Sequence, residues 1–314
     1  MTAPPFDVLD VTSWEVAEEE ASGEDEKVWL LDPRPSAFPQ RWLYKPITQH
    51  PDRAQGEDWA EKLVSEIGSL LTVPCAEVEL ASRGGQRGLL SLNLRPDGWE
   101  LQPGAVVLSA VDPKYRPGRL DPKGRPGHSL TNIAAVLADC DPPLGTSVPA
   151  EMSAFDVFAG YLLLDAWVAN RDRHDENWAV MRAQVGGGRL ALAGSYDHAG
   201  SLGFNLTDRA RTRLVQADDV RRWASRGTAW RFEHDPSAAP SQCPTLVRLA
   251  SDALNQGSPL AHAFWLDRLE NVTLDTLEQL VARVPEMSDP ARTFALRLLD
   301  INRRRLLDEC IRSA

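Results

Sequence analysis

Close pairs of cysteines are absent from this sequence. Its four cysteines are spread along the chain and form no C-x-x-C pair: Cys75, Cys140, Cys243 and Cys310. This spacing gives a cysteine-based zinc site little support and is typical of reduced thiols in the core of a cytoplasmic protein. Internal repeats and low-complexity tracts are also absent, so no repeat architecture is predicted.

A membrane segment and an excess of positive charge are missing as well. Residues 1–10 lack the basic and apolar regions of a signal peptide. The most apolar run, 154–170, contains Asp156 and Asp165 and is too interrupted to span a bilayer. The formal net charge is −11, which disfavours a nucleic-acid-binding surface. We therefore expect a cytoplasmic protein with no membrane contact and no direct nucleic-acid contact.

The chain does contain enough apolar material for a large folded core. It has 314 residues, a hydrophobic content of 43% and ten tryptophans. This composition argues against a disordered chain, because a disordered chain has few apolar side chains to bury. The length allows two domains or one fold with two lobes.

The first third of the sequence, residues 1–111, predicts a β-rich unit with one helix. Strands are predicted at 27–32 and 41–47, joined by a Pro-rich loop. At 56–71 apolar residues recur at helical spacing and acidic residues cluster in the first turns, which predicts a helix. Three more strands are predicted, one with the alternation of an edge strand at 77–80 and two others at 88–94 and 105–111.

The remainder, residues 112–314, is predicted to be mostly helical. A connector rich in proline and glycine, 112–127, leads into it. Two apolar runs between Trp178 and Asp197 flank Gly186-Gly187-Gly188 and predict a β-hairpin. With the first third, this layout predicts an α+β fold with two lobes. The predicted helices are 130–139, 150–170, 245–255, 261–270, 274–283 and 290–309.

A dense group of charged and amide side chains separates a predicted apolar helix from this hairpin. Asp172 is followed five positions later by Asn177, and the hairpin leads to Asp197. Phosphoryl transfer from ATP needs a carboxylate that accepts the proton of the attacking hydroxyl, and it needs oxygen ligands for Mg²⁺. The spacing therefore predicts a kinase in which Asp172 is the base and Asn177 and Asp197 are the magnesium ligands.

The same stretch permits a plainer interpretation as a solvated helix end, since runs of charge are commonly exposed. Its position between two apolar elements, and the presence of Asn177, favour the catalytic interpretation. A register that begins at His174-Asp175 leaves too few residues before Asn177 to match the pattern. We expect His174 to order the loop by hydrogen bonding, because no second His or Cys lies nearby to share a metal.

Several stretches resemble HipA-like serine/threonine kinases. Residues 170–177, followed by Ser195-Tyr196-Asp197, resemble the catalytic loop and the metal-binding Tyr-Asp of that family. Residues 22–27, Ser-Gly-Glu-Asp-Glu-Lys, resemble its phosphate loop and share the glycine, a glutamate and the final lysine. The resemblance thus implies that Gly23 and Lys27 contact the nucleotide phosphates.

A third stretch, Trp42-Leu43-Tyr44-Lys45, is similar to the strand that supplies the ATP-binding lysine of the family. Lys45 would contact the phosphates as a point charge. Its ion-pair partner is expected on the helix at 56–71. Glu61 matches the family position, and Glu66 is the second candidate.

The resemblance implies a protein-kinase-like fold that binds ATP and Mg²⁺ and phosphorylates serine or threonine in a protein substrate. The better-known members are toxins of toxin–antitoxin systems, so an antitoxin-like partner is also implied. No HipA-type serine stands directly ahead of the phosphate loop, where Glu18, Glu19 and Glu20 lie. Autophosphorylation at that place is therefore not predicted.

Other functions remain open. Asp172-Arg173-His174 with Asn177 also resembles phosphatidylinositol kinases, so the acceptor can be a lipid or a small-molecule hydroxyl, although the acidic chain disfavours a lipid. Glu24 and Asp25 add negative charge to the phosphate loop, which favours a nucleotide-binding protein that acts through a partner with little transfer activity. A basic cluster fits either a phosphate or acidic-substrate site or an ordinary solvated face: Arg209, Arg211, Arg213, Arg221, Arg222 and Arg226.

Overall fold

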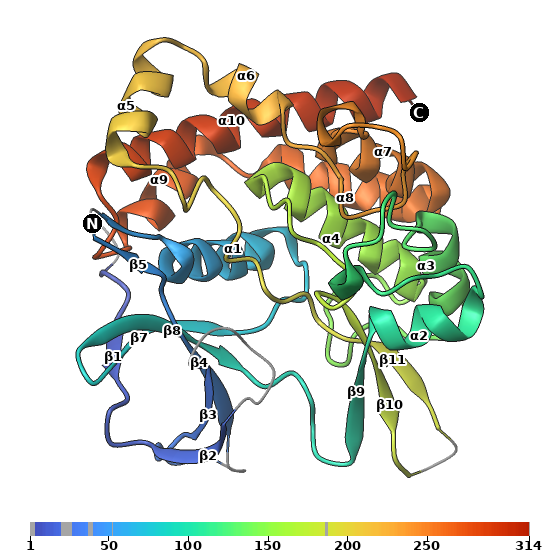
Figure 1. The fold of residues 1–314 in the computed structure, drawn as a ribbon, viewed down its shortest axis with the longest axis horizontal. Coiled ribbons are helices and arrows are strands. Elements are labelled where there is room, and N and C mark those ends of the chain that lie inside the picture. The colour runs from blue at the N-terminus through green and yellow to red at the C-terminus, as the bar shows by residue number, and fades with distance from the viewer. Residues whose placement is uncertain (1–3, 20–26, 37–39, 52, 186–187, 314) are drawn as a thin grey trace.

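A six-stranded sheet and one helix form the first part of the chain (Figure 1). This computed structural model describes residues 4–19, 27–36, 40–51, 53–185 and 188–313. The strands of this part are β1 (Val8–Asp10), β2 (Glu15–Glu19), β3 (Val28–Leu31), β4 (Arg41–Pro46), β5 (Gln49–His50), β6 (Arg53–Ala54), β7 (Val78–Arg83) and β8 (Gln86–Leu92). The sheet order is β1-β7-β8-β4-β3-β2, and β5 and β6 form a separate small hairpin.

The predicted helix is α1 (Glu57–Leu71), which packs on β7 and β8 (Figure 1). Trp59, Leu63 and Ile67 recur at helical spacing and are all buried. The first turn is acidic, where the helix dipole favours negative charge. The helix ends at Thr72, whose left-handed backbone (φ 60°) forms the C-cap.

The predicted pairing of the two strands after the phosphate loop is confirmed. Val28 of β3 lies opposite Tyr44 of β4, and β4 pairs with β8 on its other side. The predicted edge position of the strand near residue 80 is wrong, because β7 lies between β1 and β8. β1 pairs with it in parallel, with Val8 opposite Leu80, and this three-residue strand is too short to show a sequence pattern.

One predicted strand is a helix. Residues 105–111 belong to α2 (Gly104–Val111), which follows strand β9 (Trp99–Pro103). The backbone N–H groups of the first two helical residues donate to the carbonyls of Trp178 and Asp175, each at 2.8 Å. These tertiary hydrogen bonds satisfy donors that a helix start leaves free, and they outweigh the weak strand preference of the valines.

The predicted hairpin is present and gains β9 as a third strand. It consists of β10 (Ala179–Ala183) and β11 (Leu190–Leu192), in the order β11-β10-β9. α2 packs on α3 (Leu130–Leu137). β9 and α2 both precede residue 112 and yet contact the second part of the chain, so a lobe boundary between residues 111 and 112 stays a prediction.

The helical remainder is built around α4 (Ala154–Val168), every residue of which is buried. Ser153 and Asp156 form a capping box at its start. The indole Nε1 of Trp167 donates to the carbonyl of Leu299 at 3.0 Å, and that of Trp265 donates to the Asp156 carbonyl at 2.8 Å. The other helices are α5 (Asp208–Gln216), α6 (Val220–Ser225), α7 (Leu246–Gln256), α8 (Pro259–Asn271), α9 (Leu274–Ala282) and α10 (Asp289–Ser313).

The α+β class with a β-rich first part and a mostly helical second part is confirmed (Figure 1). All six helices predicted for the second part are found, whereas α5 and α6 are not predicted, since short helices rich in charge show little periodicity. In the described part of the chain, no helix is long and apolar enough to cross a membrane.

Candidate active site

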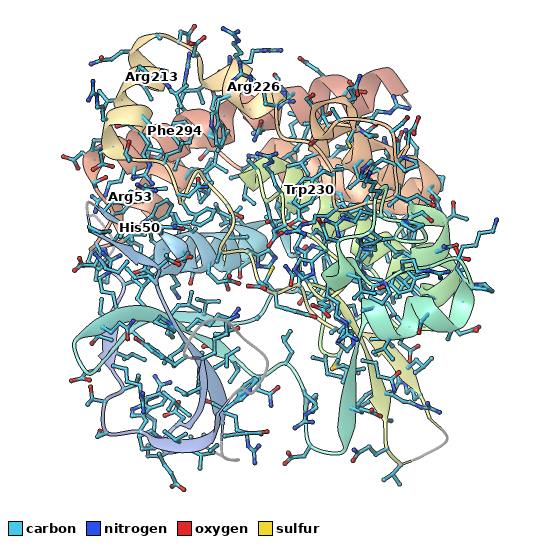
Figure 2. All side chains as sticks on the ribbon, in the orientation of Figure 1. His50, Arg53, Arg213, Arg226, Trp230 and Phe294 are labelled. Carbon is cyan, nitrogen blue, oxygen red and sulfur yellow. The ribbon has the colours of Figure 1, made fainter. Side chains whose placement is uncertain are left out.

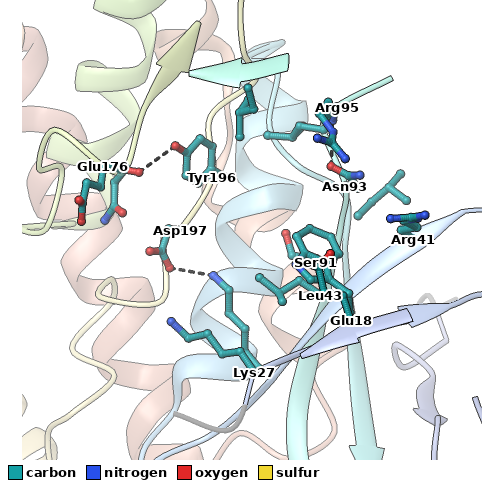
Figure 3. A pocket seen from close by; sticks show the side chains of 16 residues that line it. Glu18, Lys27, Arg41, Leu43, Ser91, Asn93, Arg95, Glu176, Tyr196 and Asp197 are labelled. Carbon is teal, nitrogen blue, oxygen red and sulfur yellow. Dashed lines mark hydrogen bonds and ion pairs between the residues drawn. The ribbon is translucent and has the colours of Figure 1, made fainter. Parts of the chain in front are cut away.

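A cavity of about 410 Å³ opens between the six-stranded sheet and the loops that lead to and from the β10–β11 hairpin (Figure 3). Its apolar wall includes Trp29, Leu43, Leu92 and Leu101. Charged and amide side chains from both parts of the chain complete it: Lys27, Lys45, Glu176, Asn177 and Asp197. The lining also contains Glu18, Arg41, Asn93 and Arg95, and such a mixture of apolar and charged side chains suits a ligand with an aromatic ring and an anionic tail.

Lys45 and Asp197 form an ion pair across this cavity, drawn as a dashed line from Asp197 in Figure 3. Lys45 Nζ on β4 lies 3.0 Å from Asp197 Oδ1, which follows β11. The charge of Lys45 holds the pKa of Asp197 well below its usual range, and the charge of Lys27 lowers that pKa further. Asp197 is therefore an anion at physiological pH, as a cation ligand must be.

The side-chain amide of Asn177 forms a hydrogen bond across the loop between α4 and β10. Asn177 Nδ2 donates to the backbone carbonyl of Asp172 at 2.8 Å. This hydrogen bond directs the amide nitrogen of Asn177 into the loop and leaves Oδ1 as the atom for a cation. As expected, His174 takes part in the ordering of the loop, because its Nδ1 accepts from the Glu176 N–H at 3.1 Å.

Beneath this loop lies a buried ion pair that the sequence did not reveal. Arg173 donates to both oxygens of Asp165 on α4, at 2.7 and 2.9 Å. It also donates to the Asn177 carbonyl at 2.5 Å and to Ser195 Oγ at 2.8 Å. Burial alone would lower the pKa of Arg173, but the Asp165 carboxylate outweighs burial and raises it. Arg173 thus joins the loop that carries Asp172 to the segment that carries Asp197.

The network continues to Glu61 on α1. Ser195 Oγ lies 2.7 Å from His198 Nε2, and His198 Nδ1 lies 3.5 Å from Glu61 Oε1. These two contacts connect the segment that carries Asp197 to α1. Burial raises the pKa of Glu61, but the contact with His198 and the charge of Lys45 together lower it.

The structure distinguishes the two glutamates considered for Lys45. Glu61 is fully buried beside the cavity, whereas Glu66 lies 2.8 Å from Lys62 in an ion pair on the same helix. Neither carboxylate oxygen of Glu61 accepts a hydrogen bond from the described residues. A buried carboxylate that neighbours both Lys45 and His198 suits the expected pairing.

The phosphate-loop residues are only partly visible. Lys27 precedes β3 and lines the cavity, where Figure 3 shows it beside Asp197. Gly23, together with Glu24 and Asp25, lies outside the described residues. The role of the loop therefore stays a prediction.

A second carboxylate–cation pair lies at Asp172. Arg231 Nη2 and Nε lie 2.6 and 2.8 Å from Asp172 Oδ1. Arg231 belongs to the loop that follows α6, far along the chain from Asp172, and sequence reasoning missed it. A possible signal is its position between Trp230 and Phe232, since an arginine flanked by aromatic residues is often held in place.

Asp175, which belongs to the alternative register that the spacing disfavours, has a structural role. Its Oδ2 accepts from the Tyr115 hydroxyl and from the Gly118 N–H, the latter at 2.7 Å. Asp175 is buried. Burial, together with the hydrogen bond to Asp175, raises the pKa of Tyr115, which keeps that hydroxyl a donor. Asp175 therefore fastens the Pro- and Gly-rich connector to the loop.

The basic cluster of the sequence contains both buried and exposed arginines. Arg211 is buried and lies 2.8 Å from Asp208. Arg213 and Arg226 are exposed on and after the short helices α5 and α6, at the opposite end of the helical part from β9–β11 (Figure 2). The cluster thus contributes no side chain to the wall of the cavity described above.

The donor set fits Mg²⁺ with a phosphate ligand. Among the described residues, no three His, Cys, Asp or Glu side chains gather in a group that could hold a metal alone. Mg²⁺ is usually held by one or two carboxylates together with substrate phosphates and water. Asp197 and Asn177, which offer one carboxylate and one amide oxygen to the same cavity, match that requirement.

Comparison with known proteins supports the fold. No family model matches the chain, and neither does any curated protein. Among solved structures, the Helicobacter pylori proinflammatory kinase CtkA is similar at 15% identity and a TM-score of 0.70, over 98% of this chain and 99% of that one. HipA of Shewanella oneidensis MR-1, solved with HipB and operator DNA, is similar at 14% identity and a TM-score of 0.52.

The HipA match covers 95% of this chain and 66% of the HipA chain. The predicted resemblance to a HipA-like, protein-kinase-like fold is thereby confirmed at the level of the fold. Identities this low do not transfer an activity or a substrate, since one fold can serve several functions.

Proposed function

We propose that this protein is an ATP- and Mg²⁺-dependent kinase that transfers the γ-phosphoryl group to a serine or threonine hydroxyl of a protein. One observation carries the proposal. Asp197, Asn177 and Lys45 line one cavity, and Asn177 is hydrogen-bonded to the backbone of Asp172. A kinase-like fold supplies the context in which those residue types perform phosphoryl transfer.

The nucleotide would lie with its base against the apolar wall and its phosphates toward Lys45, with Gly23 and Lys27 of the phosphate loop beside them. Asp197 and Asn177 would hold Mg²⁺, which when bound neutralises charge on the phosphate oxygens. Lys45 would then exchange part of its contact with Asp197 for the phosphates. Glu61, buried and without a hydrogen-bond donor among the described residues, would hold the lysine in that position.

Asp172 would orient the acceptor hydroxyl and take its proton. Its side chain is 45% exposed, so a hydroxyl can reach it from solvent. The acceptor oxygen forms a bond to the γ-phosphorus, the bond from that phosphorus to the bridging oxygen breaks, and ADP leaves with the electron pair. The proton passes to Asp172, so charge and atoms balance.

A protein acceptor is proposed because residues 170–177 and 195–197 resemble HipA-like serine/threonine kinases and the chain shares a kinase-like fold with CtkA and HipA. An antitoxin-like protein partner is proposed on the same ground, since the HipA relative was solved with HipB. A lipid or small-molecule acceptor is the second candidate, and labelling of lipids instead of proteins would reveal it.

A nucleotide-binding protein without transfer activity is a third candidate. The negative charges of Glu24 and Asp25 favour it, because they repel nucleotide phosphates. Such a protein would bind ATP without transferring label to any acceptor.

The test is incubation with γ-labelled ATP and Mg²⁺, with and without cell lysate. The wild type should label a protein band, and Asp172→Ala and Asp197→Ala should not. The matched control is Asp139→Ala, because Asp139 is an exposed aspartate distant from the cavity. ATP binding without label transfer by the wild type would remove the kinase proposal, and failure to bind ATP would remove the nucleotide proposals altogether.

A further inference from the structure

We propose that Arg231 is a catalytic residue of this transfer, whose guanidinium binds the phosphoryl group while it moves from ATP to the acceptor. This inference rests on the proposed kinase function. It adds a second cation on the acceptor side of the site, opposite Lys45 on the nucleotide side.

The first support is the way Arg231 contacts Asp172. Its two contacts, from Nη2 at 2.6 Å and from Nε at 2.8 Å, reach the same oxygen, Oδ1. Oδ2 therefore remains available to an acceptor hydroxyl. An arginine that blocked the base would cover both oxygens in a bidentate pair, which is its preferred geometry with a carboxylate.

The second support is the framework that holds Arg231. Its guanidinium stacks on Trp230, with Cζ 3.9 Å from the ring centroid. Its carbonyl lies 2.8 Å from His128 Nδ1, and the Glu233 N–H donates to the His128 carbonyl at 2.8 Å. The side chain and the backbone of Arg231 are therefore both fixed.

His128 links this framework to the catalytic loop. Its Nε2 accepts from the indole Nε1 of Trp178 at 3.2 Å, and Trp178 follows Asn177 directly. Phe232 stacks on the imidazole, with ring centroids 4.5 Å apart. Burial lowers the pKa of His128 to about 4, so it is neutral and can accept on one side and donate on the other. The position of Arg231 is thus tied to that of the metal-ligand loop.

The third support is reach. An acceptor hydroxyl that donates to Oδ2 would lie about 2.7 Å from it. Its oxygen approaches the γ-phosphorus to about 3 Å before attack. The oxygens of the phosphoryl group then come within the range of a guanidinium already bonded to Oδ1. Arginine is suited to such oxygens, because its planar donors match their geometry and its charge is permanent.

An ordinary surface ion pair is the competing explanation. Such pairs contribute about 0–1 kcal/mol and need no supporting structure. Arg231 is 24% exposed and has aromatic stacking, a fixed carbonyl and a buried histidine behind it. A surface ion pair needs no such support, whereas a catalytic charge must be held in position before the reaction begins.

The test compares Arg231→Gln and Arg231→Lys with the wild type, and uses Arg304→Gln as the matched control, because Arg304 is an exposed arginine on α10 that pairs with a carboxylate, Asp300. At saturating ATP, the rate of label transfer should fall about 10²- to 10³-fold in Arg231→Gln. Arg231→Lys should recover part of the loss. ATP affinity and the thermal midpoint should change little in either variant.

A second measurement does not depend on turnover. Aluminium fluoride added to the ADP–Mg²⁺ complex imitates the phosphoryl group in transfer, and the gain in affinity over ADP alone is read by calorimetry. We expect that gain in the wild type and in Arg304→Gln, and its loss in Arg231→Gln. Unchanged or faster transfer by Arg231→Gln, or an undiminished gain, would overturn the inference. An inactive wild type would instead refute the proposed kinase function.

Discussion

The molecule contains two carboxylate–cation pairs at its candidate site, and they are built differently. Lys45 and Asp197 come from the two parts of the chain, 152 positions apart, with side chains 15% and 35% exposed. Arg231 and Asp172 both belong to the helical part and are more open at Asp172, which is 45% exposed. The proposed nucleotide side of the site thus depends on how the sheet meets the helical part, whereas both residues of the proposed acceptor side belong to the helical part.

This difference suggests a division of work. The Asp197 carboxylate is held as an anion by two lysines, which suits binding of a cation with phosphates. The Asp172 carboxylate keeps one oxygen open toward solvent, which suits a hydroxyl that arrives with a separate substrate. The buried pair Arg173–Asp165 lies between them and touches both segments.

The largest effect is expected at the acceptor pair. Asp172→Asn should reduce the rate of phosphoryl transfer by about 10²- to 10⁴-fold, because an amide cannot accept the hydroxyl proton. ATP affinity should be preserved, since Asp172 does not belong to the nucleotide side. Single-turnover transfer and ATP calorimetry measure the two quantities, with Asp139→Asn as control. A parallel loss of ATP affinity would break the proposed division.

The next largest effect is expected at the buried ion pair Arg173–Asp165, which lies beneath both carboxylate–cation pairs. Arg173→Met leaves the buried Asp165 carboxylate without its partner and should cost about 3–5 kcal/mol of unfolding free energy. Denaturant unfolding measures this cost. The neighbouring Arg171 is exposed, so Arg171→Met should cost less than about 0.5 kcal/mol. Equal effects of the two substitutions would show that the loop does not depend on the buried pair.

Acidification should weaken the framework of the acceptor pair. Burial lowers the pKa of His128 to about 4 from an ordinary 6.5. Below pH 6.5 the unfolded chain therefore binds a proton that the folded chain refuses, and stability falls as the pH drops from about 6.5 to 4, by about 2–3 kcal/mol. Unfolding free energies at several pH values should show this slope in the wild type. The slope should flatten in His128→Gln, and an unchanged slope would assign it to other groups.

The smallest effect is expected at Glu61. Glu61→Gln keeps the shape but removes the charge that faces Lys45, and transfer should slow by about tenfold, as for loss of one charge-assisted hydrogen bond. Glu66→Gln is the matched control on the same helix, because Glu66 pairs with Lys62. A larger loss with Glu66→Gln would reverse the choice between the two glutamates.

Local patterns in the sequence were sufficient to predict the two carboxylates, the amide and the lysine of the candidate site. The spacing predicted Asn177 and Asp197, and the strand pattern predicted Lys45; these three line one cavity, and Asn177 is hydrogen-bonded to the backbone of the fourth predicted residue, Asp172. These residues lie at the ends of regular elements, and such ends follow from periodicity and turn signals. The role of each residue in catalysis stays a prediction.

The residues that support the site could not be predicted in this way, because they depend on contacts between distant segments. Arg231 meets Asp172 across 59 positions, and His128 lies 103 positions from Arg231, so no local spacing indicates either contact. The sequence shows Arg173 only as one charge among several in the loop, and its buried ion pair with Asp165 of α4 depends on how the loop folds back onto that helix. The wrong prediction of a strand at 105–111 has the same origin, because the first N–H groups of α2 donate to the distant carbonyls of Trp178 and Asp175.

The division between the two pairs is tested most directly by the effect of Mg²⁺ on ATP affinity. Calorimetric titrations with and without Mg²⁺ should show tighter ATP binding with the cation in the wild type and in Asp172→Asn. Asp197→Asn should lose that enhancement. Retention of the full enhancement by Asp197→Asn, or its loss in Asp172→Asn, would contradict the assignment of the metal to the Lys45–Asp197 side.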